Sequence, residues 1–440
     1  MPGGLSKVNI MFNWYGNHKI GILGAANSGK TILLTSLLWH LSNHDSERFP
    51  LSADARICDF QIQKRKQNAF NFALHKNTFT QKHRWPDKTC DFSVADCRYN
   101  RRDHLCERHI KFVDIPGERI SDILLWKANS YAEWVDALFD FWEENPRIRD
   151  IMHQYWEQAK NTDTTLEQLN ILYKNAMWKM LEYYCPITPS TYYLGTDGQM
   201  LGDKDNADRE KTIQTRPIWD GGELLPVPDT WKNTRQEEYK AFERNFKCYK
   251  RQVLKPLFDE INDCDNFIFC VDILNILMSG PELLLQTQQE FKDFIAHLAP
   301  SKLGRWVNRI GNNPPRLAFV ATKSDMVSSA NKDKLDFLLK DFAEPLVASG
   351  MKYRRFICSA CISTEERCDE QGAIRLIGRD SDAPQNYIEL KGDLPEYWPD
   401  QWDGGDYIYP EVVPCISATR PPKQNNLNKL FEFIVEDKDR

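Results

Sequence analysis

The sequence lacks the features of several large protein classes. It has no run of about 18 consecutive apolar residues, the length that a membrane-spanning helix needs, and one of its best stretches, NFIFCVDILNILM at 266–278, carries polar positions. No leader of charged, apolar and small residues opens the chain, and 12 cysteines in 440 residues fall far short of a disulfide scaffold. These absences predict a cytoplasmic protein without a transmembrane segment, and they leave peripheral membrane contact open.

The sequence also lacks an excess of positive charge. The 57 lysines and arginines are outnumbered by 63 aspartates and glutamates, which gives a net charge of −6. No nucleic-acid partner is expected from that balance, because binding to a phosphate backbone relies on an excess of lysine and arginine. What the chain does have is 41% hydrophobic residues, enough for a large core in one to three domains.

Short apolar runs alternate with helical patterns along the chain. This alternation predicts an α/β fold of three layers, in which helices cover a mostly parallel sheet. Six runs have the length of strands: 18–23, 92–98, 109–114, 266–272, 316–321 and 354–359. Roughly 150 residues separate the third run from the fourth, far more than an ordinary connection, so something is inserted there.

The insertion is predicted to be a mostly helical subdomain at 118–263. Apolar and aromatic residues recur in it at spacings of three and four, as in amphipathic helices. Its proline- and glycine-rich part at 186–233 predicts a long loop. The flanking ranges 1–117 and 264–440 are then two halves of one domain, the second with a Pro/Gly-rich tail and a closing helix. One aromatic stripe is more typical of a subdomain core than of a ligand cage: Trp126, Trp134, Phe139, Trp142, Tyr155 and Trp156.

The stretch GAANSGKT at 24–31 lies between the first predicted strand and a helical pattern. It matches G-x-x-x-x-G-K-[ST] in the context that gives this motif meaning. Backbone N–H groups of such a loop wrap a phosphate, Gly29 permits close approach, Lys30 bridges the β and γ phosphates, and Thr31 offers a hydroxyl to Mg²⁺. The predicted nucleotide contacts here are Gly24, Ala25, Ala26, Asn27, Ser28, Gly29, Lys30, Thr31 and Ile32.

The sequence Asp114-Ile115-Pro116-Gly117 ends the third predicted strand. A carboxylate at this place can hold Mg²⁺ through water, and Gly117 lets a backbone N–H approach a γ-phosphate; the alternative is a plain Pro-Gly turn. Glu118 follows where many GTPases have a water-orienting glutamine, and repulsion between its carboxylate and the phosphate predicts slow hydrolysis. Arg119 either compensates transition-state charge or pairs with Glu118 in solvent.

Two loops after the last predicted strands point to the base. Thr322-Lys323-Ser324-Asp325 matches the [NT]-K-x-D loop with which GTPases read guanine. Its aspartate accepts from the ring N1–H and the exocyclic amine, groups that adenine does not present there. Ser359-Ala360-Cys361 occupies the place of the Ser-Ala loop that contacts the guanine carbonyl oxygen, with Cys361 where lysine is usual; the Ser-Ala of PCISATRP at 414–421 is the alternative.

A second Mg²⁺ ligand is expected between the first helix and the second strand. Thr89 in WPDKT is the first choice, because it directly precedes a predicted strand. Thr78 and Thr80 compete with it, and a plain turn hydroxyl is the alternative reading of Thr89.

The chain resembles the YcjX-like family of P-loop GTPases, a branch with a helical insertion. Beyond the nucleotide motifs, the resemblance rests on RWPDKTCDFSVADCRY (84–99), VDIPGERISD (113–122), LLPVPD (224–229), CVDILNILMSGPELL (270–284), FVATKSDMV (319–327) and LFEFIVEDK (430–438). The resemblance covers nearly the whole chain. It implies a domain that binds GTP and GDP, with switch loops and a stress-related or regulatory role.

The sequence as a whole therefore predicts a P-loop NTPase of GTPase-like fold that binds guanine nucleotide with Mg²⁺ and hydrolyses GTP slowly. The predicted catalytic residues are Lys30, Gly117, Glu118 and Arg119, and the predicted metal ligands are Thr31, Thr89 and Asp114. Two alternatives stay open: an ATPase with an incidental TKSD loop, and a scaffold that holds nucleotide without hydrolysing it. The helical insertion is the predicted contact for an unidentified protein partner.

Overall fold

A computed structural model describes most of the chain, in two compact units. The first unit comprises Met1–Ile115, Asp263–Leu284 and Lys302–Arg440, and the second comprises Pro116–Asn262 and Leu285–Ser301. The described residues are 17–52, 57–82, 84–86, 91–101, 107–183, 185–194, 201, 208–308, 315–347, 351–368, 374–381, 383–390, 393–403, 405–414 and 416–435.

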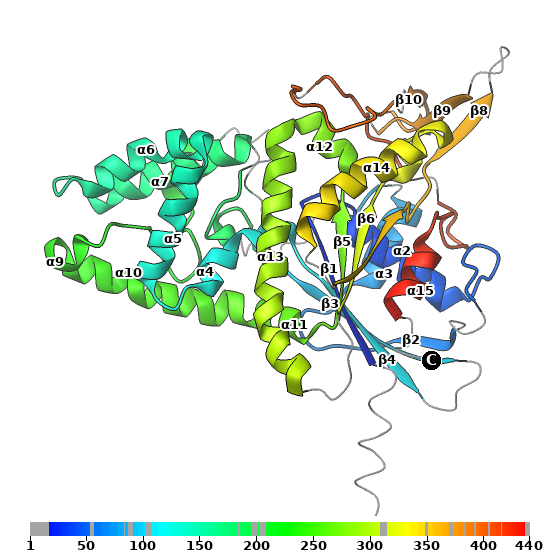
Figure 1. Cartoon of the computed structure of the whole chain (residues 1–440), viewed down its shortest axis with the longest axis horizontal. Helices are drawn as coiled ribbons and strands as arrows, with labels where there is room; N and C mark the ends of the chain where they lie inside the picture. The colour runs from blue at the N-terminus through cyan, green and yellow to red at the C-terminus, as the bar shows by residue number, and fades with distance from the viewer. Residues whose placement is uncertain are drawn as a thin grey trace, which may run out of the picture. The chain divides into compact units, whose positions relative to one another are not determined.

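A mixed seven-stranded sheet is the centre of the first unit (Figure 1). Its strands lie in the order β2-β3-β4-β1-β5-β6-β7. The five strands from β4 to β7 in this order are parallel, and β3 and β2 add antiparallel pairs at one edge. The strands are β1 (Asn17–Gly24), β2 (Ile57–Ile62), β3 (Ser93–Arg101), β4 (Arg108–Asp114), β5 (Asn266–Val271), β6 (Arg316–Ala321) and β7 (Lys352–Ile357). The predicted α/β fold with a mostly parallel sheet is confirmed.

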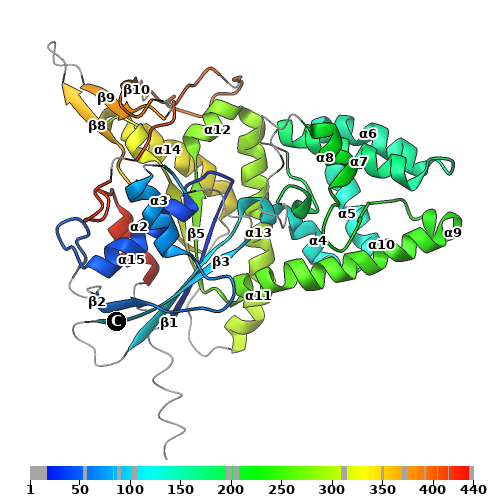
Figure 2. The same ribbon diagram turned by 180° about the vertical axis from the view of Figure 1, so that it is seen from behind.

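Helices cover both faces of this sheet. Figure 2 shows α2 (Lys30–Asn43), α3 (Phe72–Gln81) and α15 (Leu427–Val435) in front of the strands, and Figure 1 shows α14 (Lys332–Ala343) on the opposite face. Alternate residues of the strands, such as Ile20 and Ile22, are buried in one core with Leu34 of α2 and Phe431 of α15. The central strands β5 and β6 are buried along their whole length, as strands covered on both faces must be.

The first unit carries further elements around the sheet. They are α12 (Ile273–Ser279), the part of α13 (Pro281–Asn308) that lies outside 285–301, and short 3₁₀ turns at Ser324–Met326, Ser329–Asn331 and Glu344–Leu346. A small antiparallel sheet of β8 (Thr364–Cys368), β9 (Ile374–Arg379) and β10 (Tyr387–Leu390) was not predicted from the sequence.

The second unit is helical. Capping residues and a proline mark where several of its helices begin. Ser130 caps α5 by accepting from the Glu133 N–H, Pro146 occupies the first turn of α6, and Thr165 caps α7 in a reciprocal capping box. Its helices are α4 (Ile123–Lys127), α5 (Tyr131–Glu144), α6 (Pro146–Lys160), α7 (Leu166–Glu182), α8 (Arg209–Thr215), α9 (Trp231–Thr234), α10 (Gln236–Tyr249), a π-helical turn (Lys250–Leu254), α11 (Lys255–Asp263) and the part of α13 at 285–301, with 3₁₀ turns η2 (Gly117–Asp122) and η3 (Ser190–Tyr192).

Aromatic side chains form much of the core of this unit, as predicted. Trp134, Trp142 and Tyr155 are buried, Trp126 stacks on Phe258, and Phe139 stacks on Trp156.

The predicted long loop at 186–233 includes three short helices among its described residues and a buried segment without helix or strand at 224–227. The Tyr155 hydroxyl donates to the Pro226 carbonyl (2.8 Å), and the Val227 N–H donates to the Tyr131 hydroxyl (3.1 Å). These hydroxyls satisfy backbone groups that neither a helix nor a sheet provides for, which is why the segment can be buried.

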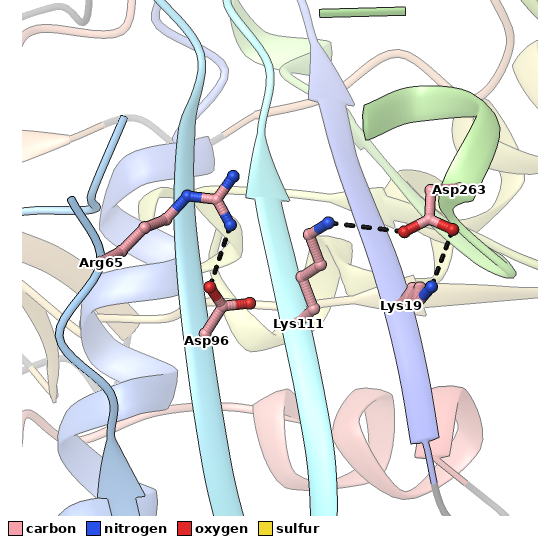
Figure 3. A network of polar contacts seen from close by, with 5 residues as sticks. All are labelled: Lys19, Arg65, Asp96, Lys111 and Asp263. Carbon is pink, nitrogen blue, oxygen red and sulfur yellow. Dashed lines mark hydrogen bonds and ion pairs between the residues drawn. The ribbon is translucent and has the colours of Figure 1, made fainter. Parts of the chain in front are cut away.

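A polar network lies on the face of β1 and β4 opposite to the core that contains Ile20 (Figure 3). Lys19 and Lys111 are partners in register on these neighbouring strands, and their ammonium groups lie 2.7 Å and 3.5 Å from the two carboxylate oxygens of Asp263. Arg65 pairs with Asp96 of β3 nearby, at 3.0 Å. Asp263 is the residue at which the chain re-enters the first unit, so the two lysines hold that re-entry against the sheet.

Candidate functional site

The loop after β1 has a fixed, compact form. Gly24 has a φ of 156°, and a Cβ added there would lie 2.5 Å from the carbonyl oxygen of Cys270 on β5. The Ser28 N–H closes a turn onto the Ala25 carbonyl (3.2 Å), and Gly29, at φ 85°, precedes the first residue of α2. Glycine is required at 24 by the contact with β5 and favoured at 29 by the left-handed backbone.

Lys30 folds back over this loop. Its side chain is buried, and its Nζ donates to the carbonyl oxygens of Gly24 and Ala25, at 2.8 Å each. The loop therefore presents a fixed ammonium group beside the N-terminus of α2, where both charge and helix dipole favour an anion.

Thr31 and Asp114 join the loop to β4. The Thr31 hydroxyl donates to Asp114 Oδ2 (2.9 Å), and the carboxylate is fully buried. Burial raises the pKa of Asp114, whereas the charge of Lys30 and the Thr31 hydrogen bond oppose that rise. Asp114 Oδ1 has no hydrogen-bond partner in the described part of the chain. A hydroxyl and a buried carboxylate with an unused oxygen form the hard-oxygen set that suits Mg²⁺.

The threonine predicted as the second metal ligand, Thr89, lies outside the described residues. Its two competitors are on α3. There the hydroxyls of Thr78 and Thr80 donate to the carbonyl oxygens of Leu74 (3.0 Å) and Lys76 (3.1 Å).

Gly117, Glu118 and Arg119 belong to the second unit, in η2. Arg119 is buried, and its guanidinium donates to Ser190 Oγ (3.0 Å), which in turn donates to Asp122. The alternative in which Arg119 pairs with Glu118 in solvent is therefore wrong, because the guanidinium has a buried partner within its own unit. The role predicted for Arg119 beside a phosphate stays a prediction.

The Thr322–Asp325 loop leaves β6 beside the loop after β1. An ideal Cβ on Gly29 would lie 3.7 Å from the Cβ of Thr322, and the Thr322 N–H donates to the Val271 carbonyl at the end of β5 (3.1 Å). Lys323 pairs with Asp272, whose carboxylate lies 2.5 Å from the ammonium group. Asp272 was not predicted as a site residue; the signal in the sequence was an aspartate directly after the apolar run 266–271, and the structure shows that it is buried.

Asp325 is held by the loop after β7. Its Oδ1 accepts from the Ser359 hydroxyl (2.6 Å) and its Oδ2 from the Ser363 N–H (2.9 Å). Ser36 of α2 donates to the Ala360 carbonyl and so connects this loop to the helix after Lys30. The alternative Ser-Ala pair at 417–418 is exposed, and the Ser417 hydroxyl contacts the Thr419 hydroxyl (2.9 Å).

Cys361 is buried in a small apolar cluster rather than presented to solvent. It packs with Trp39, Phe79 and Ile416, and Ile32 lies against the same cluster. The cluster thus links the start of α2 to the Ser359–Cys361 loop.

One edge of the sheet collects these groups. The five parallel strands end at the same edge (Figure 1), and the residues at 24–32, Asp114, Asp272, 322–325 and 359–361 all follow or end those strands. The helix after β1, α2, covers one face of the sheet, and α14, which follows β6, covers the other. The strand order reverses between β1 and β5, and open α/β sheets bind ligands at such a switch point.

These features define an α/β protein with a candidate anion site at the carboxyl edge of a mostly parallel sheet. Comparison with protein families makes the assignment specific: the family described as YcjX-like family, DUF463, matches residues 18–438. Because the match covers nearly the whole chain, the protein belongs to this family, as its resemblance implied. No curated protein matches the chain. Among the described helices, none has the length and apolar character needed to cross a membrane.

Proposed function

We propose that this protein is a P-loop protein that binds GTP and GDP together with Mg²⁺. The phosphates would lie against the Gly24–Thr31 loop, with Lys30 as the neutralising charge. Support comes from the ammonium group fixed at the loop and from the strand-loop-helix order of the motif.

The observation that carries the choice of guanine is the bonding of Asp325. The Ser359 hydroxyl and the Ser363 N–H each donate to one of its carboxylate oxygens and so hold the group in place. A carboxylate presents only acceptors, which suits the paired N1–H and amino donors of guanine. Adenine has an acceptor at N1 and no amino group at C2, so it would place acceptors against the carboxylate.

Mg²⁺ would be held by the Thr31 hydroxyl and, through water, by Asp114. The ion supplies neutralisation of the charge on the phosphates when it is bound. The unused Asp114 Oδ1 and the absence of any sulfur or imidazole in the donor set fit this hard cation.

Turnover would be slow. In the sequence Glu118 follows Gly117, where a water-orienting glutamine is common, and a carboxylate in that role would disfavour the approach of a charged γ-phosphate. We therefore assign the protein a regulatory or stress-related switch role, in which the nucleotide state is reported to a protein partner by the helical unit.

Base specificity is tested by Asp325→Asn, with affinities for GTP, ATP and xanthosine triphosphate measured by competition. The amide would turn one acceptor into a donor, so GTP affinity should fall and xanthosine triphosphate affinity should rise. Asp150→Asn makes the same chemical change at an exposed site on α6 and should alter neither. Equal affinity of the wild-type protein for GTP and ATP would replace this proposal with the ATPase alternative.

Hydrolysis is tested separately by single turnover with excess protein and Mg²⁺. Slow phosphate release supports the GTPase assignment. No release over hours would leave a nucleotide-bound scaffold in its place.

A further inference from the structure

The ion pair between Asp272 and Lys323 connects the segments that follow two neighbouring strands, β5 and β6. Asp272 is almost fully buried directly after β5, whereas the Lys323 side chain is 39% exposed. The other carboxylate oxygen of Asp272 accepts from the Asn275 N–H (3.1 Å) and caps α12. The carboxylate is therefore fixed by its own helix, and the lysine is the partner with freedom to move.

The backbone of Lys323 is also unusual. Its φ of 56° and ψ of 30° place it in the left-handed region, which a lysine rarely adopts. Such a conformation costs on the order of 1 kcal/mol and persists where the surroundings enforce it, typically at functional sites. Here the Met326 N–H bonds the Lys323 carbonyl (2.9 Å), and the Thr322 N–H bonds β5.

The charge on Lys323 is maintained by Asp272. Burial alone would lower the pKa of Lys323, but the neighbouring carboxylate of Asp272 outweighs that effect and raises the pKa above its ordinary value. The ammonium group thus stays protonated and attached to Asp272.

We propose that Asp272 is a positioning residue for the guanine base. This inference rests on the proposed function. Thr322 lies beside the phosphate-binding loop and Asp325 reads the base edge, so the aliphatic stem of Lys323 leaves the chain between these two contacts. By holding the ammonium end, Asp272 keeps that stem in one conformation as an apolar surface for the purine ring.

The benefit is pre-organisation. A lysine side chain loses up to about 2 kcal/mol of rotamer free energy when it is ordered. If Asp272 orders the stem in the free protein, the nucleotide does not have to, and affinity for the base rises without a new contact.

A double-mutant cycle tests this role, with Kd for GDP, ADP and pyrophosphate measured on the full chain. Asp272→Asn keeps a side chain that can cap α12 but removes the charge. We expect GDP binding to weaken about tenfold, within the range of coupling between contacting residues. In the Lys323→Met background the same change at 272 should have no further effect, because Asp272 acts only through Lys323. Pyrophosphate, which has no base, should bind all four proteins equally.

The unfolding midpoint without nucleotide provides the structural control. It should fall in Asp272→Asn by no more than corresponds to the loss of one partly exposed ion pair, about 1 kcal/mol. If the asparagine variant does not fold, Asp272→Ser, which also caps a helix, takes its place in the cycle. Two results would overturn this inference and leave the proposed function intact. One is a GDP affinity of Asp272→Asn within twofold of wild type. The other is a double variant in which the separate effects of the two substitutions multiply. A wild-type protein that does not prefer GDP over ADP would overturn the proposed function and this inference with it.

Discussion

Replacing Asp122 by alanine removes the centre of a buried hydrogen-bond network in the second unit. The Asp122 carboxylate is fully buried and accepts from the Thr188 hydroxyl (2.8 Å), the Ser190 N–H (2.9 Å), the Ser190 hydroxyl (2.5 Å) and the Tyr249 hydroxyl (2.8 Å). A buried donor left without a partner costs about 1–3 kcal/mol. The hydroxyls can rotate toward other acceptors, but the Ser190 N–H and the charge of Arg119 cannot be satisfied in this way. We therefore expect a loss of about 3 kcal/mol, because a buried N–H loses its acceptor and the charge of Arg119 loses a nearby carboxylate.

Urea unfolding and hydrogen exchange at Ser190 measure this loss. The amide of Ser190 should exchange faster in Asp122→Ala, because opening of the segment becomes less costly. Asp122→Asn, which keeps one acceptor oxygen, should lose about half as much, and Asp150→Ala, at an exposed position on α6, should lose less than about 0.5 kcal/mol. A loss below about 1 kcal/mol in Asp122→Ala, with protection of Ser190 unchanged, would refute the assignment of these bonds as the support of η2.

Two further changes have definite expected outcomes. Burial and the nearby charges of Glu118 and Asp293 raise the pKa of Glu290 to about 7, against the hydrogen bond from Gln286. The unfolded state releases the proton of this carboxyl group at pH ~4.3, whereas the folded state keeps it up to about pH 7. The free energy of unfolding therefore falls as the pH rises from the first value to the second. Glu290→Gln should raise the urea midpoint at pH ~8 and change it little at pH ~4.5; a larger gain in acid would contradict this. Gly24→Ala places a Cβ 2.5 Å from the Cys270 carbonyl oxygen, so we expect the free energy of unfolding to fall by about 1–3 kcal/mol. The increase in melting temperature on adding GDP should also become smaller. An unchanged increase would show that the loop tolerates the contact.

Burial made the central strands easiest to predict, although the edge strand β7 was also predicted, at 354–359, and buries few of its residues. β5 and β6 are fully buried and therefore read as continuous apolar runs, whereas β2 was missed. β2 is an edge strand that pairs only with β3, has a register shift between Cys58 and Gln61, and buries few of its residues. The exposed strand β8, TEERC, was missed for the same reason: little burial leaves little hydrophobic pattern.

The candidate site shows a similar division. Lys30, Thr31 and Asp325 were named from the sequence because each lies in a short motif whose spacing is typical of phosphate or base contacts. Asp272 and the buried state of Arg119 could not, because they depend on contacts far along the chain. Lys323 lies 51 residues after Asp272, and Ser190 lies 71 residues after Arg119.

The hydrogen bonds around Asp122 join residues 117–122 to later parts of the inserted helical unit. The residues directly after Ile115, including the glycine predicted at the γ-phosphate, fold as part of the second unit. Arg119 and Asp122 secure them to Ser190, deep within the insertion. A descendant of this protein that lost the insertion would lose the support of residues 117–122 in the same event. Residues 117–122 and the insertion must therefore be inherited or lost together, unlike an accessory domain that can be added to or removed from a protein without affecting its other parts.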